Sequence, residues 1–217
     1  MNVQRRNDMN NETVSRLMKA AEELFAEFGH ENVSLRQLTS RAGVNVAAVN
    51  YYFGSKEALT DAVFERLTQE ACAYRRQKIA ELGEEIEDRR SHLEALVRIF
   101  VHPYLGEGNE VSGRLLARFF LRHRLHPTEG TQRITDTYNN PFAHEYIAEL
   151  KKVCPSLCPK DIFWHYQFMV NTIMISSAED TSFERIEVLS GGEISTASRA
   201  ERMEALVRFL VSALSDG

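Results

Sequence analysis

The sequence has little cysteine and no long apolar run. Its 217 residues include three cysteines, Cys72, Cys154 and Cys158, whose number and spacing match neither a disulfide framework nor a zinc site. The most apolar stretch, residues 162–177, is interrupted by polar side chains and falls short of the roughly 20 apolar residues that a membrane span requires. No secretory signal is recognisable at the start of the chain. We therefore expect a cytoplasmic protein without a membrane span, a metal or another cofactor.

An excess of positive charge is lacking too. The net charge is −5, which argues against a nucleic-acid partner because Lys and Arg supply most of the affinity for phosphates. The charge is unevenly distributed, however. Residues 1–60 hold seven Lys/Arg and seven Asp/Glu, which leaves 19 and 24 for the rest of the chain. The acidity therefore lies in the second part, and a neutral N-terminal segment can still bind DNA if its positive groups face one side.

Motifs of enzymes are absent from the sequence. It contains no nucleophile elbow, no His-Glu-x-x-His motif, no phosphate-binding loop and no dinucleotide fingerprint. His123 and His126 lie three residues apart without a carboxylate motif nearby, so we interpret them as a solvated basic turn. We therefore expect a protein that is not an enzyme and has no catalytic residues.

Helical periodicity is what the sequence does contain, and its first 55 residues have the pattern of a helix-turn-helix. Apolar residues recur at steps of three and four over 12–28, which predicts an amphipathic helix that ends at Gly29. Ser34 and Gln37 form a capping box for a second helix, and Gly43 permits a tight turn. Asn45 can then cap a third, short helix to about Phe53, with its Val49 facing the core.

The rest of the chain also indicates helices and no strands, so we expect an all-α fold. A long helix is predicted from Ser55 onward, with Gly83 as an interruption in a charged stretch. Residues 179–198 lack clear periodicity and suggest a loop, with some helix near 183–189. Further helices are expected at about 91–105, 111–125, 128–152, 159–178 and 199–215, with breaks at Pro103, Pro127, Pro155 and Pro159.

The stretch SLRQLTSRAGVNVAAVNYYFGSKEAL, residues 34–59, resembles the DNA-binding domain of the TetR family of bacterial repressors. Residues 49–54 and the Ile-Phe-Trp at 162–164 are similar to a subgroup whose known members respond to fatty acids or acyl thioesters. The resemblance implies three parts: a flexible N-terminal arm (1–11), a helix-turn-helix DNA-binding domain (12–60), and a domain for effector binding and dimerisation (61–217).

The DNA-contacting residues are expected at the third helix and at its two flanks. The small apolar side chains that begin the third helix suit contact with thymine methyl groups. Tyr51 and Tyr52 are adjacent and cannot share a face, and the resemblance implies that Tyr51 points outward while Tyr52 packs beneath the helix. By the resemblance, Arg36 matches a position that can bind guanine, Lys56 is a phosphate ligand, and Asn50 stands where the family usually has Tyr. Arg5 and Arg6 belong either to a minor-groove arm or to a disordered tail. The full set is Ser34, Leu35, Arg36, Asn45, Val46, Ala47, Ala48, Asn50, Tyr51, Tyr52 and Lys56.

The second domain is expected to dimerise and to hold a small, largely apolar effector. The apolar stripes of 159–178 (Ile162, Tyr166, Met169, Val170, Ile173) and 199–215 (Met203, Leu206, Val207, Leu210, Leu214) suit either a four-helix dimer interface or the protomer's own core, and the resemblance favours the interface. An effector pocket would lie between helices. Its candidate residues, among aromatic and polar groups in 93–174, are Phe100, Phe119, Phe120, His123, Tyr138, Phe142, Trp164, Phe168 and Asn171. Arg118 and His165 are further candidates for a polar head group.

We therefore expect a transcriptional regulator, in particular a repressor that binds a palindromic operator as a homodimer and responds to an effector, with a fatty acid or acyl thioester as the candidate. The alternative is a helical adaptor whose helix-turn-helix serves only protein contacts. The adaptor would bind no palindrome and would tolerate the loss of Lys56 and Arg36.

Overall fold

The computed structural model describes residues 2–83, 85–178, 182–194 and 199–215, with side chains except at 2–9 and 182–184. Every regular element in these ranges is helical, and none of them contains a strand. The all-α expectation is confirmed. Among the same residues, no helix combines the length and apolarity that crossing a bilayer needs.

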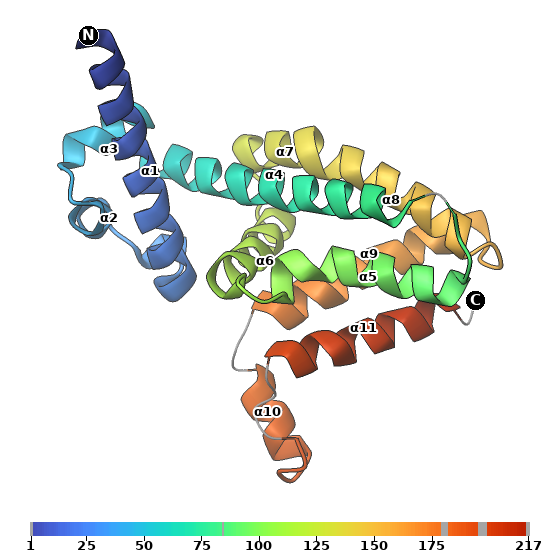
Figure 1. Ribbon diagram of the computed structural model, residues 1–217. Helices are drawn as coiled ribbons and strands as arrows, with labels where there is room; N and C mark the ends of the chain where they lie inside the picture. Colours follow the sequence, from blue (N-terminus) through green and yellow to red (C-terminus); the bar gives the residue numbers. More distant parts are fainter. Residues whose placement is uncertain (1, 84, 179–181, 195–198, 216–217) are drawn as a thin grey trace.

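The first three helices form a small N-terminal unit that projects from the body of the molecule (Figure 1). Leu17, Phe25, Leu38 and Val49 are fully buried and join the three helices in one core, as the stripe of residues 12–28 predicts. The elements are α1 (Asn2–Phe28), a short 3₁₀ turn (His30–Asn32), α2 (Leu35–Ala42) and α3 (Val46–Tyr52).

Helix α4 (Lys56–Leu82) connects the N-terminal unit to the rest of the chain. It has 27 residues and therefore a length of roughly 40 Å. The Ser55 hydroxyl caps its first turn, and Gly83, with φ +75°, ends it at the interruption that the sequence predicts. Figure 1 shows α4 leaving the N-terminal unit and running along the larger domain.

The larger domain is a bundle around a continuous aromatic and aliphatic core. Helix α9 packs against α5, α6 and α8, and α5 also packs against α6 and α8. Helix α4 packs against α5, α6 and α7, and α11 packs mainly against α5. Helix α10 projects from the bundle (Figure 1). The elements are α5 (Arg89–Leu105), α6 (Glu110–Leu125), α7 (Glu129–Ile134), a π turn (Thr135–Asn139), α8 (Asn140–Val153), α9 (Pro159–Ala178), α10 (Ser182–Leu189) and α11 (Arg199–Ser215).

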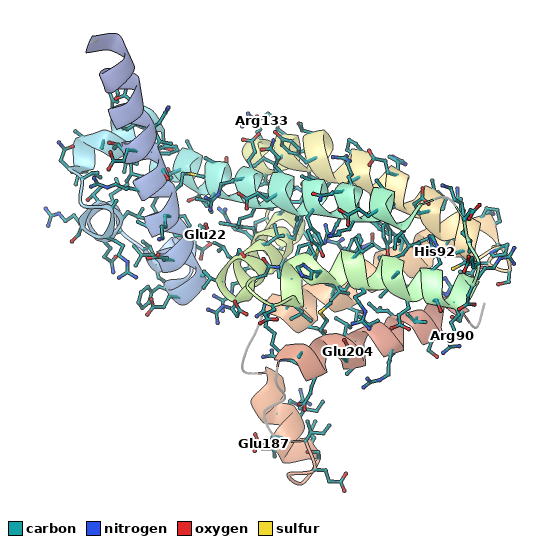
Figure 2. The ribbon with its side chains drawn as sticks, viewed as in Figure 1. Glu22, Arg90, His92, Arg133, Glu187 and Glu204 are labelled. Atoms are coloured by element: carbon teal, nitrogen blue, oxygen red, sulfur yellow. The ribbon has the colours of Figure 1, made fainter. Side chains whose placement is uncertain are left out.

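Two arginines join the domains. Arg118 on α6 donates to the carbonyl oxygen of Ala26 at 2.8 Å and to that of Ala178 at 3.0 Å, so one guanidinium holds the ends of α1 and α9. Arg66 on α4 pairs with Glu22 on α1, which Figure 2 labels. Arg118, a candidate for binding an effector head group, does not line the internal cavity described below, and its described bonds go to the backbone at the domain junction.

Three boundaries differ from the sequence-based prediction. Helix α1 begins at Asn2, and not near Glu12, so it continues through the segment predicted as an arm. That segment is polar and has no apolar stripe by which periodicity could detect a helix. Pro103 lies inside α5, whose last residue is Leu105, because a proline in the last turn forfeits only one backbone bond. The predicted helix 128–152 is α7, the π turn and α8 in succession.

The apolar stripes assigned to a dimer interface are the protomer's own core. Ile162, Met169 and Ile173 of α9 are buried, as are Val207 and Leu210 of α11. Helix α9 is apolar on more than one side, so periodicity alone cannot tell which side faces inward. Arg98 of α5 binds Glu204 of α11, labelled in Figure 2, and reinforces this packing at the surface.

Candidate nucleic-acid interface and effector cavity

Side-chain caps define the ends of α2 and α3. The Ser34 hydroxyl accepts from the Gln37 backbone N–H at 3.3 Å, and the Gln37 side-chain oxygen accepts from the Ser34 N–H at 2.8 Å. This reciprocal pair is the predicted capping box. The Asn45 side chain accepts from the Ala48 N–H at 3.0 Å and caps α3, also as predicted. The short recognition helix therefore begins at one defined residue.

A glycine and an arginine fix the turn between α2 and α3. Gly43 adopts the left-handed conformation, with φ +64° and ψ +39°. The Arg16 guanidinium, reaching from α1, donates to the Ala42 carbonyl oxygen through Nε at 2.8 Å and through Nη2 at 2.6 Å, and to the Gly43 carbonyl oxygen at 2.5 Å. These carbonyls would otherwise lack helical partners. Sequence reasoning missed Arg16, since nothing local shows that it reaches 26 residues along the chain.

The outward side of α3 is exposed to solvent. Tyr51 is 72% exposed, and Val46, Ala47 and Asn50 are exposed beside it, whereas Val49 is fully buried. The predicted outward direction of Tyr51 is confirmed. A surface of small and flat groups on a capped helix can approach the base edges in a major groove closely.

Three residues of the predicted set face at least partly inward. Leu35, Ala48 and Tyr52 are partly buried against the core. The Tyr52 hydroxyl donates to Asn10 Oδ1 at 2.7 Å, which ties α3 to α1, so the expectation that Tyr52 packs beneath the helix is confirmed. The exposed candidates for base contact are therefore fewer than the sequence suggested.

Positive side chains flank this surface. Arg36 is exposed on the first turn of α2, and Lys56 is the first residue of α4, where unpaired backbone N–H groups already favour an anion. Ser34 lies at the N-terminus of α2, with its hydroxyl engaged in the cap. The arrangement can hold phosphates on either side of α3.

An internal cavity of about 220 Å³, partly open to solvent, lies between α4, α5, α6, α8 and α9. Of the nine predicted effector residues, it brings together Phe100, Phe120, His123 and Phe142. Burial lowers the pKa of His123, so its ring is neutral near pH 7, and its Nδ1 lies 2.9 Å from the Thr131 hydroxyl oxygen. The described part of the chain contains no cluster of residues that could hold a metal ion.

The other five predicted effector residues lie outside the cavity wall. Phe119 packs on Phe64 and His30 at the domain junction, and the Tyr138 hydroxyl donates to Glu65 on α4 at 3.1 Å. Trp164 and Phe168 stack on each other at the surface, 60% and 59% exposed. Asn171 accepts a bond from Arg124 at the edge of the cavity, and His165 bonds to its own helix. Aromatic character alone does not indicate which face a residue occupies.

Arg75 is the cavity residue that sequence reasoning missed. It is 2% exposed, and it donates to the Phe100 carbonyl oxygen through Nε at 3.2 Å and through Nη2 at 2.8 Å. Arg75 begins a charged stretch of the sequence, in which no neighbouring residue marks it as buried. The signal that could have found it is its register, because Thr68, Ala71 and Cys72 precede it by seven, four and three residues on a buried face.

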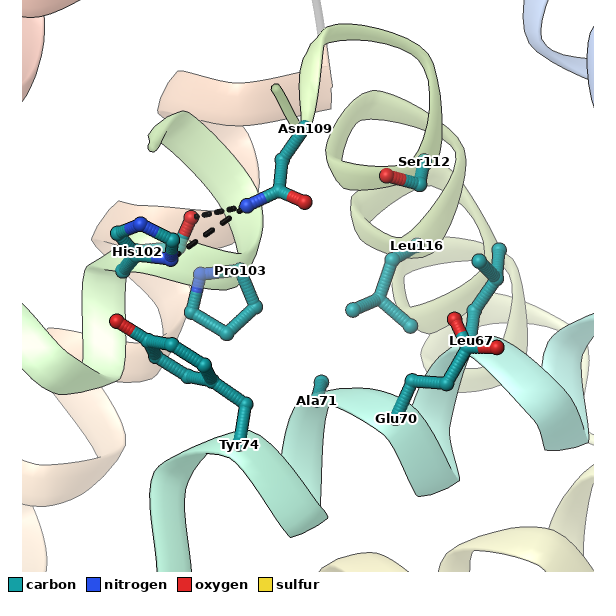
Figure 3. Close-up of a pocket in the computed structure, with 9 residues that line it drawn as sticks. All are labelled: Leu67, Glu70, Ala71, Tyr74, His102, Pro103, Asn109, Ser112 and Leu116. Atoms are coloured by element: carbon teal, nitrogen blue, oxygen red, sulfur yellow. Dashed lines mark hydrogen bonds between the residues drawn. The ribbon is translucent and has the colours of Figure 1, made fainter. Parts of the chain in front are cut away.

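A second cleft, of about 210 Å³, lies between α4, α5 and the start of α6 (Figure 3). Tyr74 stacks on His102 there, with ring centroids 4.6 Å apart, and Asn109 Nδ2 donates to the His102 carbonyl oxygen at 3.1 Å. The cleft contains none of the predicted effector residues, and Glu70 adds a negative charge to it.

Large apolar side chains are exposed on α9 and α11. Trp164, Phe168 and Ile175 lie on α9 at helical spacing, and Phe209 of α11 is 61% exposed. Helices α9 and α11 contact each other, so these groups belong to neighbouring elements. Exposed aromatic groups of this size are typical of an interaction surface.

Capped helices around a tight turn, an exposed recognition face and a separate helical domain with a cavity define a helix-turn-helix transcriptional regulator. Comparison with known families agrees. Residues 17–63 match the family described as bacterial regulatory proteins, tetR family, and residues 98–213 match the tetracyclin repressor-like C-terminal domain. The chain belongs to the TetR family, whose members are DNA-binding regulators and not enzymes.

Known relatives support the same assignment. The HTH-type transcriptional dual regulator CecR of Shigella flexneri is 40% identical over 88 residues, which are 40% of this chain and 32% of that protein. The match thus spans about a third of that relative's length. A transcriptional regulator from Rhodococcus sp. Rha1 has a similar structure, with TM-score 0.65 and 17% identity over 93% of this chain and 95% of that one. The fatty acid degradation regulator FadR from Bacillus halodurans has TM-score 0.61 and 17% identity, over 94% and 98%.

Proposed function

We propose that this protein is a homodimeric repressor that binds a palindromic operator and is modulated by a small effector in its larger domain. The observation that carries the proposal is the exposed face of α3 between Arg36 and Lys56. Base contacts would come from Val46, Ala47 and Asn50, and phosphate contacts from the flanking cations. Leu35 and Ala48 would add packing at the edge of this face.

A dimer follows from the small size of this surface. One helix-turn-helix covers few base pairs, so specific affinity at physiological salt requires two copies about 34–36 Å apart. The proposed contact between protomers is formed by the exposed apolar groups of α9 and α11, with Trp164, Phe168 and Phe209 at its centre. Burying three aromatic side chains of this kind would provide the apolar centre that such interfaces have.

Effector control would act through α4. This helix begins at Lys56, beside the recognition helix, and its Arg75 lies in the wall of the cavity about five turns further on. An effector that favours one position of α4 would change the separation of the two recognition helices. Coupling energies of about 1–3 kcal/mol are typical, which correspond to a change in operator affinity of about 5- to 150-fold.

The effector class expected from the resemblance is a fatty acid or acyl thioester. The structural similarity to a protein named as a fatty acid degradation regulator supports an acyl compound as one candidate. The cavity lies between helices and has aromatic walls, as expected of a site for a partly apolar molecule.

Binding to the protein's own upstream DNA across a salt series tests the proposal. We expect protection of a palindrome. Lys56→Ala should weaken binding to all sequences and reduce the salt slope by about 1, whereas Arg36→Ala should weaken it mainly at one base pair, by about 1–3 kcal/mol. Lys78→Ala, far along α4, is the matched control and should bind as the wild type does. Binding no tighter than to random DNA would overturn the proposal and would favour the adaptor function.

A further inference from the structure

We propose that the internal cavity binds a small organic carboxylate, with Arg75 as the residue that recognises its charge. This inference rests on the proposed effector control and names the chemical class of the effector. It is drawn from the charges, the free donors and the volume of the cavity.

The charge of Arg75 lacks a compensating partner inside the protein. A guanidinium stays protonated at every accessible pH, and burying it is costly unless a negative group neutralises it. Within the described residues, no carboxylate forms an ion pair with Arg75, and no Asp or Glu lines the cavity. Its contacts are the Phe100 carbonyl, the Tyr104 hydroxyl and the faces of three aromatic rings, whose centroids lie 4.1, 5.1 and 5.5 Å from its Cζ. None of these groups carries a negative charge at neutral pH.

Further hydrogen-bond donors line the same cavity. Thr135 Oγ1 and Asn139 Nδ2 are buried atoms without a hydrogen-bond partner, and both residues belong to the π turn that forms one wall. Leaving such groups unpaired costs about 1–3 kcal/mol each. A carboxylate accepts hydrogen bonds and carries the opposite charge, so it would satisfy the hydroxyl, the amide and the guanidinium together.

The remaining wall limits the rest of the ligand. Phe100, Phe120 and Phe142, with Val170 and Met174, provide apolar surface around the charged group. Arg124, which bonds to Asn171, adds a second positive charge to the wall. The volume is about 220 Å³, whereas a cavity of about 150 Å³ holds benzene. A phenyl ring with a short acid chain, or a short alkanoate, fits this volume. A long-chain acyl group exceeds it.

Calorimetric titration of the full-length protein with phenylacetate and its neutral isostere phenylacetamide tests the charge requirement. We expect phenylacetate to bind at least tenfold more tightly and to raise the melting temperature. Palmitate tests the size limit, and inorganic phosphate tests whether an anion without an apolar body suffices. Both should bind at least tenfold more weakly than phenylacetate.

Variants assign the preference to the cavity. Arg75→Met should lower phenylacetate affinity at least tenfold and remove the preference over the amide, whereas Lys78→Met, on the same helix and paired with Glu81, should change neither. Thr135→Val should lower affinity about tenfold, the lower end for the loss of one hydrogen bond to a charged group. If Arg75→Met does not fold, the affinity of Thr135→Val and the comparison of phenylacetate with phenylacetamide on the wild type still test whether the cavity binds a carboxylate.

Several results would overturn the inference. They are equal binding of the amide, preferred binding of palmitate or phosphate, no binding of any of the carboxylates, or phenylacetate binding that survives Arg75→Met in a folded protein. Operator binding, measured on the same preparations, separates the two claims. Intact operator binding without carboxylate binding refutes the inference alone, and carboxylate binding without operator binding refutes the proposed function.

Discussion

Replacing Gly43 by alanine should damage the helix-turn-helix in two separable ways. At φ +64° an alanine is strained by about 1–2 kcal/mol. Its Cβ would also lie 2.9 Å from Arg16 Nη2, so the guanidinium must move away from the Ala42 and Gly43 carbonyls. Because Arg16 is partly solvated, we assign the loss of these bonds about 1 kcal/mol, below the range of about 1.5–3 kcal/mol that is typical of hydrogen bonds to charged groups. The expected total is about 2–3 kcal/mol of unfolding free energy.

Gly54→Ala is the matched control for this prediction. Gly54 has φ +83° in the same domain, and nothing lies within 4 Å of the position that an alanine Cβ would take there, so only the backbone strain applies. We expect Gly54→Ala to cost about 1 kcal/mol less than Gly43→Ala, and Gly43→Ala in an Arg16→Ala background to lose that difference. Urea unfolding followed by circular dichroism measures the energies, and hydrogen exchange over residues 35–53 locates the effect. Full additivity of Gly43→Ala and Arg16→Ala, or equal costs at the two glycines, would refute the reasoning.

Three further predictions concern the interface, pH and capping. Phe209→Asp should give a monomer in analytical ultracentrifugation and weaken operator binding, whereas Leu125→Asp, exposed on α6, should remain dimeric; a dimeric Phe209→Asp would contradict the proposed interface. Burial lowers the pKa of His30 below 6.5, and the charge of Arg122 acts in the same direction. On acidification the unfolded chain therefore protonates His30 at a higher pH than the folded chain does. The folding stability associated with neutral His30 is present above pH 6.5 and is lost as the pH falls through the lowered pKa. His30→Gln should flatten the loss of stability on acidification in urea titrations, and an unchanged slope would contradict this. Asn45→Ala should cost about 1 kcal/mol in the same assay and Asn45→Ser much less, since serine also caps; equal losses would argue against capping.

The position of α4 relates the two proposals to each other. It carries Lys56 at one end and Arg75 inside the larger domain, and Arg66 pairs with Glu22 of α1 between them. Neutralising Arg75 with a carboxylate would stabilise the packing of α4 on α5 and α8. The same change would be transmitted to α1 through the domain junction, where Arg118 also binds the Ala26 carbonyl. The sign of the effect on operator affinity depends on which position of α4 suits the operator spacing.

The local architecture of this protein could be predicted from its sequence. The cap residues Ser34, Gln37 and Asn45 and the turn glycine Gly43 act within three or four residues along the chain, so their roles are visible in the sequence and recur in the structure. The ends of α9 and α11 likewise follow local signals, since the predicted ranges 159–178 and 199–215 match them. Which side of a short amphipathic helix is buried also follows from the local pattern, as Val49 shows, whereas the outward direction of Tyr51 came from the family resemblance.

Only the tertiary structure decided the contacts between residues that are distant in the sequence. On α9, apolar groups surround the helix, so packing against α5, α6 and α8 determined that Ile173 is buried while Trp164 and Phe168 face outward. Arg75, Arg16 and Arg118 are ordinary charged residues in the sequence. Their partners lie 25, 26 and 92 residues away, and only the assembled bundle makes one of them a buried cation in a cavity, another the clamp of a turn and the third the link between two domains.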